Sequence, residues 1–319
     1  MSFVNDVKAE LEDRIPPQRH CRLSELAGML LYGGNVGKNG KDELYLVFSA
    51  EKENIAKKCF TFLKKSFNMN NSVTESTEKV GRKTNYQVRI DGTDDVKKVT
   101  EKTGFVWPSK SDEAVAALSE WEWKCPQNEC CVRSFVRGLF LMSGMMNDPE
   151  KSYHYEITVP NEAVGGYLKK ALERFGCEPK LWERRGSLVV YMKDASQIAD
   201  ALTIMDATKA RVHFEDIRVV RSKRGEIQRQ VNCEIHNLAK TSEASRKQIE
   251  DIRTIQETIG FGALPEELEK MARVRIRFPE ASLQELGTHM VPPLGRSGVN
   301  HRLQKLCNIA EGIRLKEGG

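Results

Sequence analysis

A nine-residue pattern occurs twice in this 319-residue chain, and the repeat constrains the fold more than any single segment does. The first copy is LAGMLLYGG at residues 26–34, and the second is VRGLFLMSG at residues 136–144. Gly138 takes the place of Gly28 and Gly144 that of Gly34, so the residue numbers of each pair differ by 110. A unit that recurs at a fixed offset indicates a structure built from similar halves.

The segments that follow each copy also correspond to one another. Runs that alternate apolar and polar residues indicate half-buried strands, and apolar residues at helical spacing indicate helices. We therefore predict an α+β fold with two αββαββα repeats. The first copy is followed by strand 44–50, helix 51–67, strand 85–91 and helix 93–104, and the second by strand 153–160, helix 161–176, strand 187–194 and helix 195–205. The weakest predicted strands, 71–80 and 177–184, are polar and interrupted.

Glycines inside the two patterns favour a close approach of two helices. A residue without a Cβ lets helix backbones come together, as small residues do at tight helix crossings. Gly28 and Gly138 lie in helix interiors, where glycine costs about 1 kcal/mol relative to alanine. Helix termination explains Gly34 and Gly144 but not these two. We predict that Ala27, Gly28 and Gly138 pack at a seam between pseudo-symmetric halves.

Length and charge favour an ordinary multidomain protein. The length suits two or three domains, and the formal net charge is +5. No window reaches the roughly 18 uninterrupted apolar residues of a membrane helix. The N-terminal residues 1–17 carry acids where a signal peptide is basic and then apolar. We expect a cytoplasmic, nucleoid-associated protein with no membrane partner.

Eight cysteines are scattered along the chain, which favours reduced, mostly buried thiols over a disulfide framework. Only CPQNECC, with Cys125, Cys130 and Cys131, raises the hypothesis of a zinc site. A tetrahedral site needs four ligands and this segment offers three, without a second CxxC or a nearby pair of histidines. We therefore expect no metal and no cofactor.

The region after the repeats divides into a basic linker, 218–240, and a helical domain, 241–319. Four basic residues of the linker are candidate phosphate contacts: Arg218, Arg221, Lys223 and Arg224. A solvated connector without a partner is an equally good interpretation. The first helix of the domain is expected to start on Thr241 or Ser242 as N-cap and to stop at Gly260, and the next runs from Pro265 to just before Pro279.

The last two predicted helices form a helix-turn-helix at about 281–314. Ser282 followed by Glu285 suits a capping box on the first helix, and Ser297 is the expected cap of the second. Val299, Leu303, Leu306 and Ile309 or Ala310 form an apolar stripe that must face the domain core. The remaining polar residues are of the types that proteins use to recognise double-stranded DNA. The candidate contacts are Ser282, Arg296, Ser297, Asn300, His301, Arg302, Gln304 and Lys305.

The repeated pattern resembles the LAGLIDADG homing-endonuclease fold. In that family two such helices form the interface between halves, and the sheets form a saddle over DNA. The resemblance also assigns the eighth position of each helix to an acid that binds the catalytic metal, and here these positions are Gly33 and Ser143. Phosphodiester cleavage by two metals requires carboxylates to hold the cations, so we expect no catalytic residue and no nuclease activity.

The whole chain resembles the WhiA family more specifically. The resemblance lies in SFVNDVKAEL near the N-terminus, RGLFLMSGMMNDPEKSYHYEI at 137–157 and PPLGRSGVNHRLQKL at 292–306. It implies a degenerate LAGLIDADG scaffold, with repeats at 1–108 and 109–217, fused to a helix-turn-helix. It also implies a transcription regulator tied to sporulation, cell division or chromosome segregation. The alternatives are residual DNA cleavage, or a saddle used for a protein partner such as RNA polymerase or another regulator.

Overall fold

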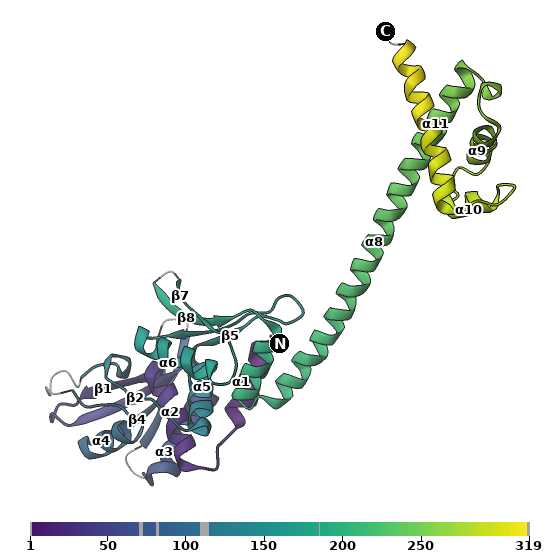
Figure 1. Cartoon of the computed structure of the whole chain (residues 1–319). Coiled ribbons are helices and arrows are strands. Elements are labelled where there is room, and N and C mark those ends of the chain that lie inside the picture. Colours follow the sequence, from purple (N-terminus) through teal and green to yellow (C-terminus); the bar gives the residue numbers. More distant parts are fainter. Residues whose placement is uncertain (1, 70–72, 81–82, 109–114, 185, 318–319) are drawn as a thin grey trace. The chain divides into compact units, whose positions relative to one another are not determined.

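The computed structural model describes residues 2–69, 73–80, 83–108, 115–184 and 186–317. The chain divides into two compact units, Met1–Ser222 and Lys223–Gly319, and the division falls within helix α8 (Thr208–Thr258) (Figure 1). Residues 71 and 72 of a predicted strand, 109–114 at the predicted repeat boundary, and 318–319 of the predicted helical domain lie outside the described residues. Within the part of the chain that the structure describes, none of the helices combines the length and apolar character needed to span a bilayer.

The two repeats have the same order of elements, which confirms the predicted αββαββα unit. The first contains α2 (Arg19–Gly33), β1 (Gly34–Lys38), β2 (Leu44–Ala50), α3 (Glu53–Phe67), β3 (Val73–Val80), β4 (Lys83–Asp91) and α4 (Thr93–Lys102). The second contains α5 (Glu129–Ser143), β5 (Gly144–Met146), β6 (Tyr155–Val159), α6 (Glu162–Glu173), β7 (Lys180–Arg184), β8 (Ser187–Met192) and α7 (Ala195–Ile204). Both polar strands that the sequence predicted only weakly, β3 and β7, are present.

Each repeat forms one antiparallel four-stranded sheet, in the orders β1-β2-β4-β3 and β5-β6-β8-β7. The strict alternation of buried and half-buried residues in β2 shows that one face of that sheet is buried and the other is partly exposed. The registers correspond, since Gly34 pairs with Phe48 and Gly144 with Ile157. The predicted unit includes β1 and β5, but the sequence analysis gave these two short strands no residue bounds. Each begins at the glycine that caps the end of the preceding helix. A glycine at that place indicates a turn, so the sequence gives no sign that a strand starts there.

An additional helix, α1 (Phe3–Asp13), packs on the repeats. Phe3, Val7 and Leu11 are spaced by four residues and are buried, so they form one apolar stripe on this helix. The carboxylate of Glu10 accepts hydrogen bonds from two backbone N–H groups in the first turn of α8, at 2.8 and 2.9 Å. An acid at that position satisfies amides that have no partner inside the helix. A short 3-10 helix, η2 (Leu118–Glu120), lies between the repeats.

The second unit contains the C-terminal part of α8, a 3-10 turn η3 (Phe261–Ala263), α9 (Glu266–Arg277), α10 (Leu283–Thr288) and α11 (Arg296–Glu317). Its core joins all four helices, and the side chains that are at most 2% exposed are Ile252, Ile255, Met271, Ala272, Leu286, Met290, Val299, Leu303, Leu306 and Ala310. Gly287 allows the chain before α11 to fold back on α10, because a Cβ there would lie 2.0 Å from the carbonyl oxygen of Leu294. An all-helical domain was therefore predicted correctly.

The predicted start of this domain's first helix is wrong. α8 runs without interruption from Thr208 to Thr258, so neither Thr241 nor Ser242 is an N-cap and the segment 218–240 is helical. This segment is rich in Arg, Lys, Glu and Gln, which favour helices, and it contains no proline. The predicted end of the helix is correct, because Gly260 follows it with a φ of +71°.

Candidate functional site

The helices α2 and α5 cross at the two interior glycines. A Cβ on Gly138 would lie 2.2 Å from the backbone oxygen of Glu25, and one on Gly28 would lie 2.7 Å from the backbone oxygen of Phe135. Any larger side chain would therefore collide with backbone rather than with a movable side chain. Ala27 is also buried, on the same helix as Gly28. The structure thus brings Gly28 and Gly138 together at the seam between the repeats, and Ala27 lies next to Gly28 on α2.

The C-terminal ends of the two seam helices carry Gly33 and Ser143, where the LAGLIDADG resemblance would place acids. At Gly33 a Cβ would lie 2.6 Å both from the ring of Phe48 and from the backbone oxygen of Ser49, so β2 fills the space an acid would need. The hydroxyl of Ser143 lies 2.8 Å from the backbone oxygen of Thr158 and 3.2 Å from that of Leu139, and its single proton is shared between these two acceptors. Both positions are therefore closed by contacts within the fold.

A tyrosine from the first repeat completes this end of the seam. The hydroxyl of Tyr32 donates to the backbone oxygen of Thr158, which also accepts from Ser143. Burial raises the pKa of Tyr32 to about 12, and the hydrogen bond with Ser143 acts in the opposite direction. Among the described residues, no group of three acids that would suit a catalytic metal lies here. The arrangement joins β6 to both seam helices through neutral groups.

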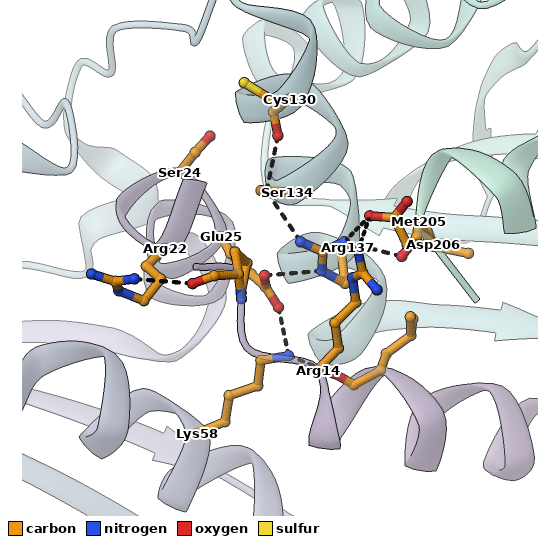
Figure 2. Close-up of polar contacts among 12 residues, drawn as sticks. Arg14, Arg22, Ser24, Glu25, Lys58, Cys130, Ser134, Arg137, Met205 and Asp206 are labelled. Carbon is orange, nitrogen blue, oxygen red and sulfur yellow. Dashed lines mark hydrogen bonds and ion pairs between the residues drawn. The ribbon is translucent and has the colours of Figure 1, made fainter. Parts of the chain in front are cut away.

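A buried ionic network lies beside the seam and was missed by the sequence analysis (Figure 2). The carboxylate of Glu25, which is fully buried, lies 2.7 Å from Nζ of Lys58 and 2.9 Å from Nε of Arg137. The guanidinium of Arg137 also lies 3.0 Å from the carboxylate of Asp206, and that carboxylate lies 2.9 Å from the guanidinium of Arg14. Burial lowers the pKa of Lys58, and the charge of Glu25 opposes that effect.

This network ties together elements that are distant in the chain. Glu25 and Lys58 belong to the first repeat, whereas Arg137 belongs to α5 and also donates to the backbone oxygen of Met205, just after α7, at 3.1 Å. The paired residues are far apart in the sequence, so no spacing signals the pairing. Buried charges are tolerated only when they are paired in this way.

The structure changes the set of residues that could form the zinc site considered from the sequence. Cys130 and Cys131 lie beside His20 and Cys21 in one group of ligand atoms, whereas Cys125 is outside that group. The sequence analysis counted three ligands from one segment, whereas the structure gathers four, of which Cys130 and Cys131 come from α5 and His20 and Cys21 from α2.

The second helix of the predicted helix-turn-helix, α11, has two distinct faces. Val299, Leu303, Leu306 and Ala310 are buried in the core of the unit, as the apolar stripe predicted. The candidate DNA contacts on the other faces are exposed, and they are Arg296, Ser297, Asn300, His301, Gln304 and Lys305. This exposed set includes basic, amide and imidazole groups within three helical turns.

Two candidate residues near this face hold the helices in place. Ser282 is the N-cap of α10, where its Oγ accepts from the N–H of Glu285 at 3.3 Å and its own N–H donates to the Glu285 carboxylate at 2.8 Å. That backbone hydrogen bond lowers the pKa of Glu285. Arg302 is half-buried and its guanidinium lies 3.0 Å from the carboxylate of Glu267 on α9. The capping box at Ser282 is confirmed.

The predicted cap at Ser297 is wrong. α11 begins at Arg296, and the N–H of Val299 donates to the backbone oxygen of Gly295 at 3.1 Å. Ser297 therefore lies inside the first turn of the helix, with its side chain exposed.

The four candidate phosphate contacts of the predicted linker have different environments. Arg218 pairs with Glu215 at 3.0 Å, one turn earlier in α8. Arg221 donates to the backbone oxygen of Pro149, and its guanidinium lies 4.4 Å from the ring centroid of Tyr153. Lys223 and Arg224 are exposed. Arg218 and Arg221 thus have contacts within the fold.

Two pseudo-symmetric LAGLIDADG-like repeats, together with a helical unit that contains a helix-turn-helix, define a LAGLIDADG-like scaffold joined to a helix-turn-helix module. Comparison with known families gives the same division. Residues 19–106 match the WhiA N-terminal LAGLIDADG-like domain, 132–224 the WhiA LAGLIDADG-like domain, and 227–310 the WhiA C-terminal HTH domain. The chain belongs to the WhiA family.

Individual relatives agree over the full length. The chain is 41% identical to the probable cell division protein WhiA of Lachnoclostridium phytofermentans, with 98% of this chain and 100% of that protein covered. It is 36% identical to the protein of the same description from Heliobacterium modesticaldum, with 100% and 98% covered. The crystal structure of full-length DUF199/WhiA from Thermatoga maritima is similar with a TM-score of 0.57 and 25% identity, and 98% of each chain is covered.

Proposed function

We propose that this protein is a sequence-specific DNA-binding transcription regulator that acts in cell division, chromosome segregation or sporulation and does not cut DNA. The observation that carries the proposal is the exposed polar face of α11 on a well-packed helix-turn-helix. The name of its relatives, probable cell division protein, supports the cellular role. The regulator would act in the cytoplasm on promoter DNA.

The α11 face has the chemistry that base recognition requires. Asn300 and Gln304 are one helical turn apart and are both exposed, and amide side chains of this kind pair with adenine through two hydrogen bonds. Arg296 and Lys305 supply positive charge, and the N-terminus of a helix supplies N–H groups that favour phosphate. A second helix presented in this way enters the major groove in helix-turn-helix proteins.

The seam supports the absence of nuclease activity. Gly33 has no side chain and β2 fills the space beside it, and Ser143 is engaged with Thr158. Neither can hold a divalent cation at a scissile phosphate. Supercoiled plasmid that carries bound sites, incubated with the full chain and Mg²⁺, should stay uncut. Site-specific nicking or linearisation would contradict this part of the proposal.

The role of Arg302 is tested through its partner. If Arg302 contacts a guanine, Arg302→Ala should weaken binding to the specific site by about 1–3 kcal/mol, and Glu267→Ala should preserve or strengthen binding because it releases the guanidinium. If Arg302 only holds α11 against α9, both substitutions should weaken binding and lower the thermal stability equally. Anisotropy titrations at one salt concentration, with thermal melts, distinguish the two roles, and an unchanged affinity in Arg302→Ala removes this residue from the contact set.

The repeats would add a second surface for DNA or for a protein such as RNA polymerase. On the open face of the second sheet Trp182 is 62% exposed. Arg184 lies two residues further along the same strand, and Val189 is the residue paired with Trp182 on β8. On the first sheet the guanidinium of Arg89 lies 3.8 Å from the ring centroid of Tyr45. Trp182→Ala in the full chain should weaken binding of whichever partner uses this face. Unchanged binding of both DNA and RNA polymerase would remove the second sheet from this role.

A further inference from the structure

Two pairs of adjacent residues meet where the seam helices begin. His20 and Cys21 occupy the second and third positions of α2, and Cys130 and Cys131 the second and third positions of α5. Their residue numbers differ by 110, the same offset that relates Gly28 to Gly138. The pseudo-symmetry that makes the seam therefore also brings these four side chains to one point. No single segment of the sequence contains all four.

The distances fit one metal ion. The Nδ1 atom of His20 lies 3.2 Å from Sγ of Cys131, 3.4 Å from Sγ of Cys21 and 3.9 Å from Sγ of Cys130. Bond lengths of about 2.3 Å for zinc to sulfur and about 2.0–2.1 Å for zinc to nitrogen, at the tetrahedral angle, place each nitrogen about 3.6 Å from each sulfur. All four ligand atoms lie within 4.8 Å of one another, so they converge on one point.

We propose that His20, Cys21, Cys130 and Cys131 bind one zinc ion that joins the first turns of α2 and α5. Three thiolates and one imidazole form a common ligand set of structural zinc sites, and four protein ligands leave no open position for catalysis. The ion would be a clamp on the seam, independent of how α11 contacts DNA.

The surroundings suit such a site. Cys21 and Cys131 are buried and His20 and Cys130 are exposed, so the ion has a path from solvent. The backbone around the ligands is held, because Ser134 donates to the carbonyl of Cys130 at 2.9 Å and Ser24 donates to that of Cys131 at 2.7 Å. Ser134 in turn accepts from Arg137 at 3.1 Å, so the buried network supports the ligand helix (Figure 2). Groups in this outer layer fix ligand orientation in metal sites.

A disulfide is a weaker interpretation of the same cluster. It would join two of the three sulfurs and would leave the third thiol and His20 without a role. It would also not explain why the imidazole nitrogen lies within 3.9 Å of all three sulfurs.

The test measures metal binding by the reduced full-length chain. The wild type should contain one zinc per chain, and cobalt should replace it with the absorption of a tetrahedral site and charge-transfer bands from bound thiolates. Cys130→Ser should weaken zinc at least about tenfold, since even outer-layer substitutions cost 10–100-fold in affinity. Cys233→Ser is the matched control, because Cys233 is also exposed and lies outside the cluster. It should bind zinc as the wild type does.

Several results would overturn the proposal. These are a wild-type chain without stoichiometric zinc after purification in zinc-containing medium, equal zinc affinity in Cys130→Ser and the wild type, or a cobalt spectrum without thiolate bands. A disulfide among these cysteines in protein that takes up no cobalt after reduction would also overturn it. If Cys130→Ser does not fold, the cobalt spectrum of the wild type still decides, because its charge-transfer intensity grows with the number of bound thiolates.

Discussion

The seam between the repeats and the exposed face of α11 differ in where their polar side chains lie: at the seam they are buried and paired, and on α11 they are exposed. At the seam, glycines bring two backbones into contact, charges are buried in pairs, and the positions expected for metal-binding acids are closed by Phe48 and Thr158. On α11, amide and basic side chains point to solvent while the helix is anchored by an apolar stripe. The seam holds a scaffold together, and α11 presents groups to a partner.

The contrast shows that the helix crossing and the chemistry at the ends of the seam helices depend on different residues. Helix packing depends on Gly28 and Gly138, which have no substitute at their distance of approach. Metal-dependent cleavage depends on side chains one or two turns further along, and those can change without breaking the crossing. Recognition can then be carried by a separate domain that folds around its own core.

The largest effect is expected from Glu25→Ala, which tests whether the seam depends on its buried network. Lys58 and Arg137 would remain buried without their shared carboxylate, and breaking a buried pair in this way costs about 3–5 kcal/mol of unfolding free energy. Chemical denaturation measures the change. Glu53→Ala is the control, because its pair with Lys57 is exposed and its loss should cost no more than about 1 kcal/mol. Equal effects would show that the network adds nothing to the seam.

A somewhat smaller loss is expected from Gly138→Ala, which tests the close crossing. The new Cβ would meet the backbone oxygen of Glu25, so the helices must separate, at a cost of about 1–3 kcal/mol. Gly166→Ala in α6 is the matched control. A Cβ there meets nothing within 4 Å, so alanine should stabilise that helix by up to about 1 kcal/mol. A Gly138→Ala protein as stable as the wild type would rule out the tight crossing.

Ser282→Ala should have the smallest effect, on the domain that carries α11. The substitution removes the side-chain cap of α10, and such losses cost about 1 kcal/mol. Stability should fall while the affinity for DNA changes little at temperatures where the domain is folded. If affinity instead falls far more than stability, Ser282 contacts DNA directly, as the sequence analysis predicted.

The features that the sequence predicted well are those that produce a recognisable pattern of residue types. The alternation of apolar and polar residues predicted both ends of β2 correctly. The self-similarity of the two halves predicted the order of elements, and Ser282 with Glu285 predicted a capping box. The apolar stripe of α11 also followed from spacing alone. Apart from the repeat with its offset of 110 residues, these signals lie within a few residues of one another, and all of them can be detected in one sequence.

The features that the sequence missed depend on contacts over long distances or on helix boundaries without strong signals. Glu25 and Arg137 are 112 residues apart, and His20 meets Cys131 only through the pseudo-symmetry of the fold. The offset of 110 residues was a signal that could have paired His20 with Cys130. The cap at Ser297 was misplaced because helix boundaries depend on backbone geometry that several residues can satisfy.

The ratio of specific to non-specific affinity in a double substitution is the sharpest test of the proposal that α11 reads DNA bases. Sites recovered by genome-wide mapping and a scrambled duplex would be titrated at one salt concentration with the wild type and with Asn300→Ala/Gln304→Ala. Because each two-fold amide contact to a base contributes about 1–3 kcal/mol of discrimination, the ratio should fall at least about tenfold while the affinity for the scrambled duplex is retained. An unchanged ratio in a folded double variant would contradict the claim.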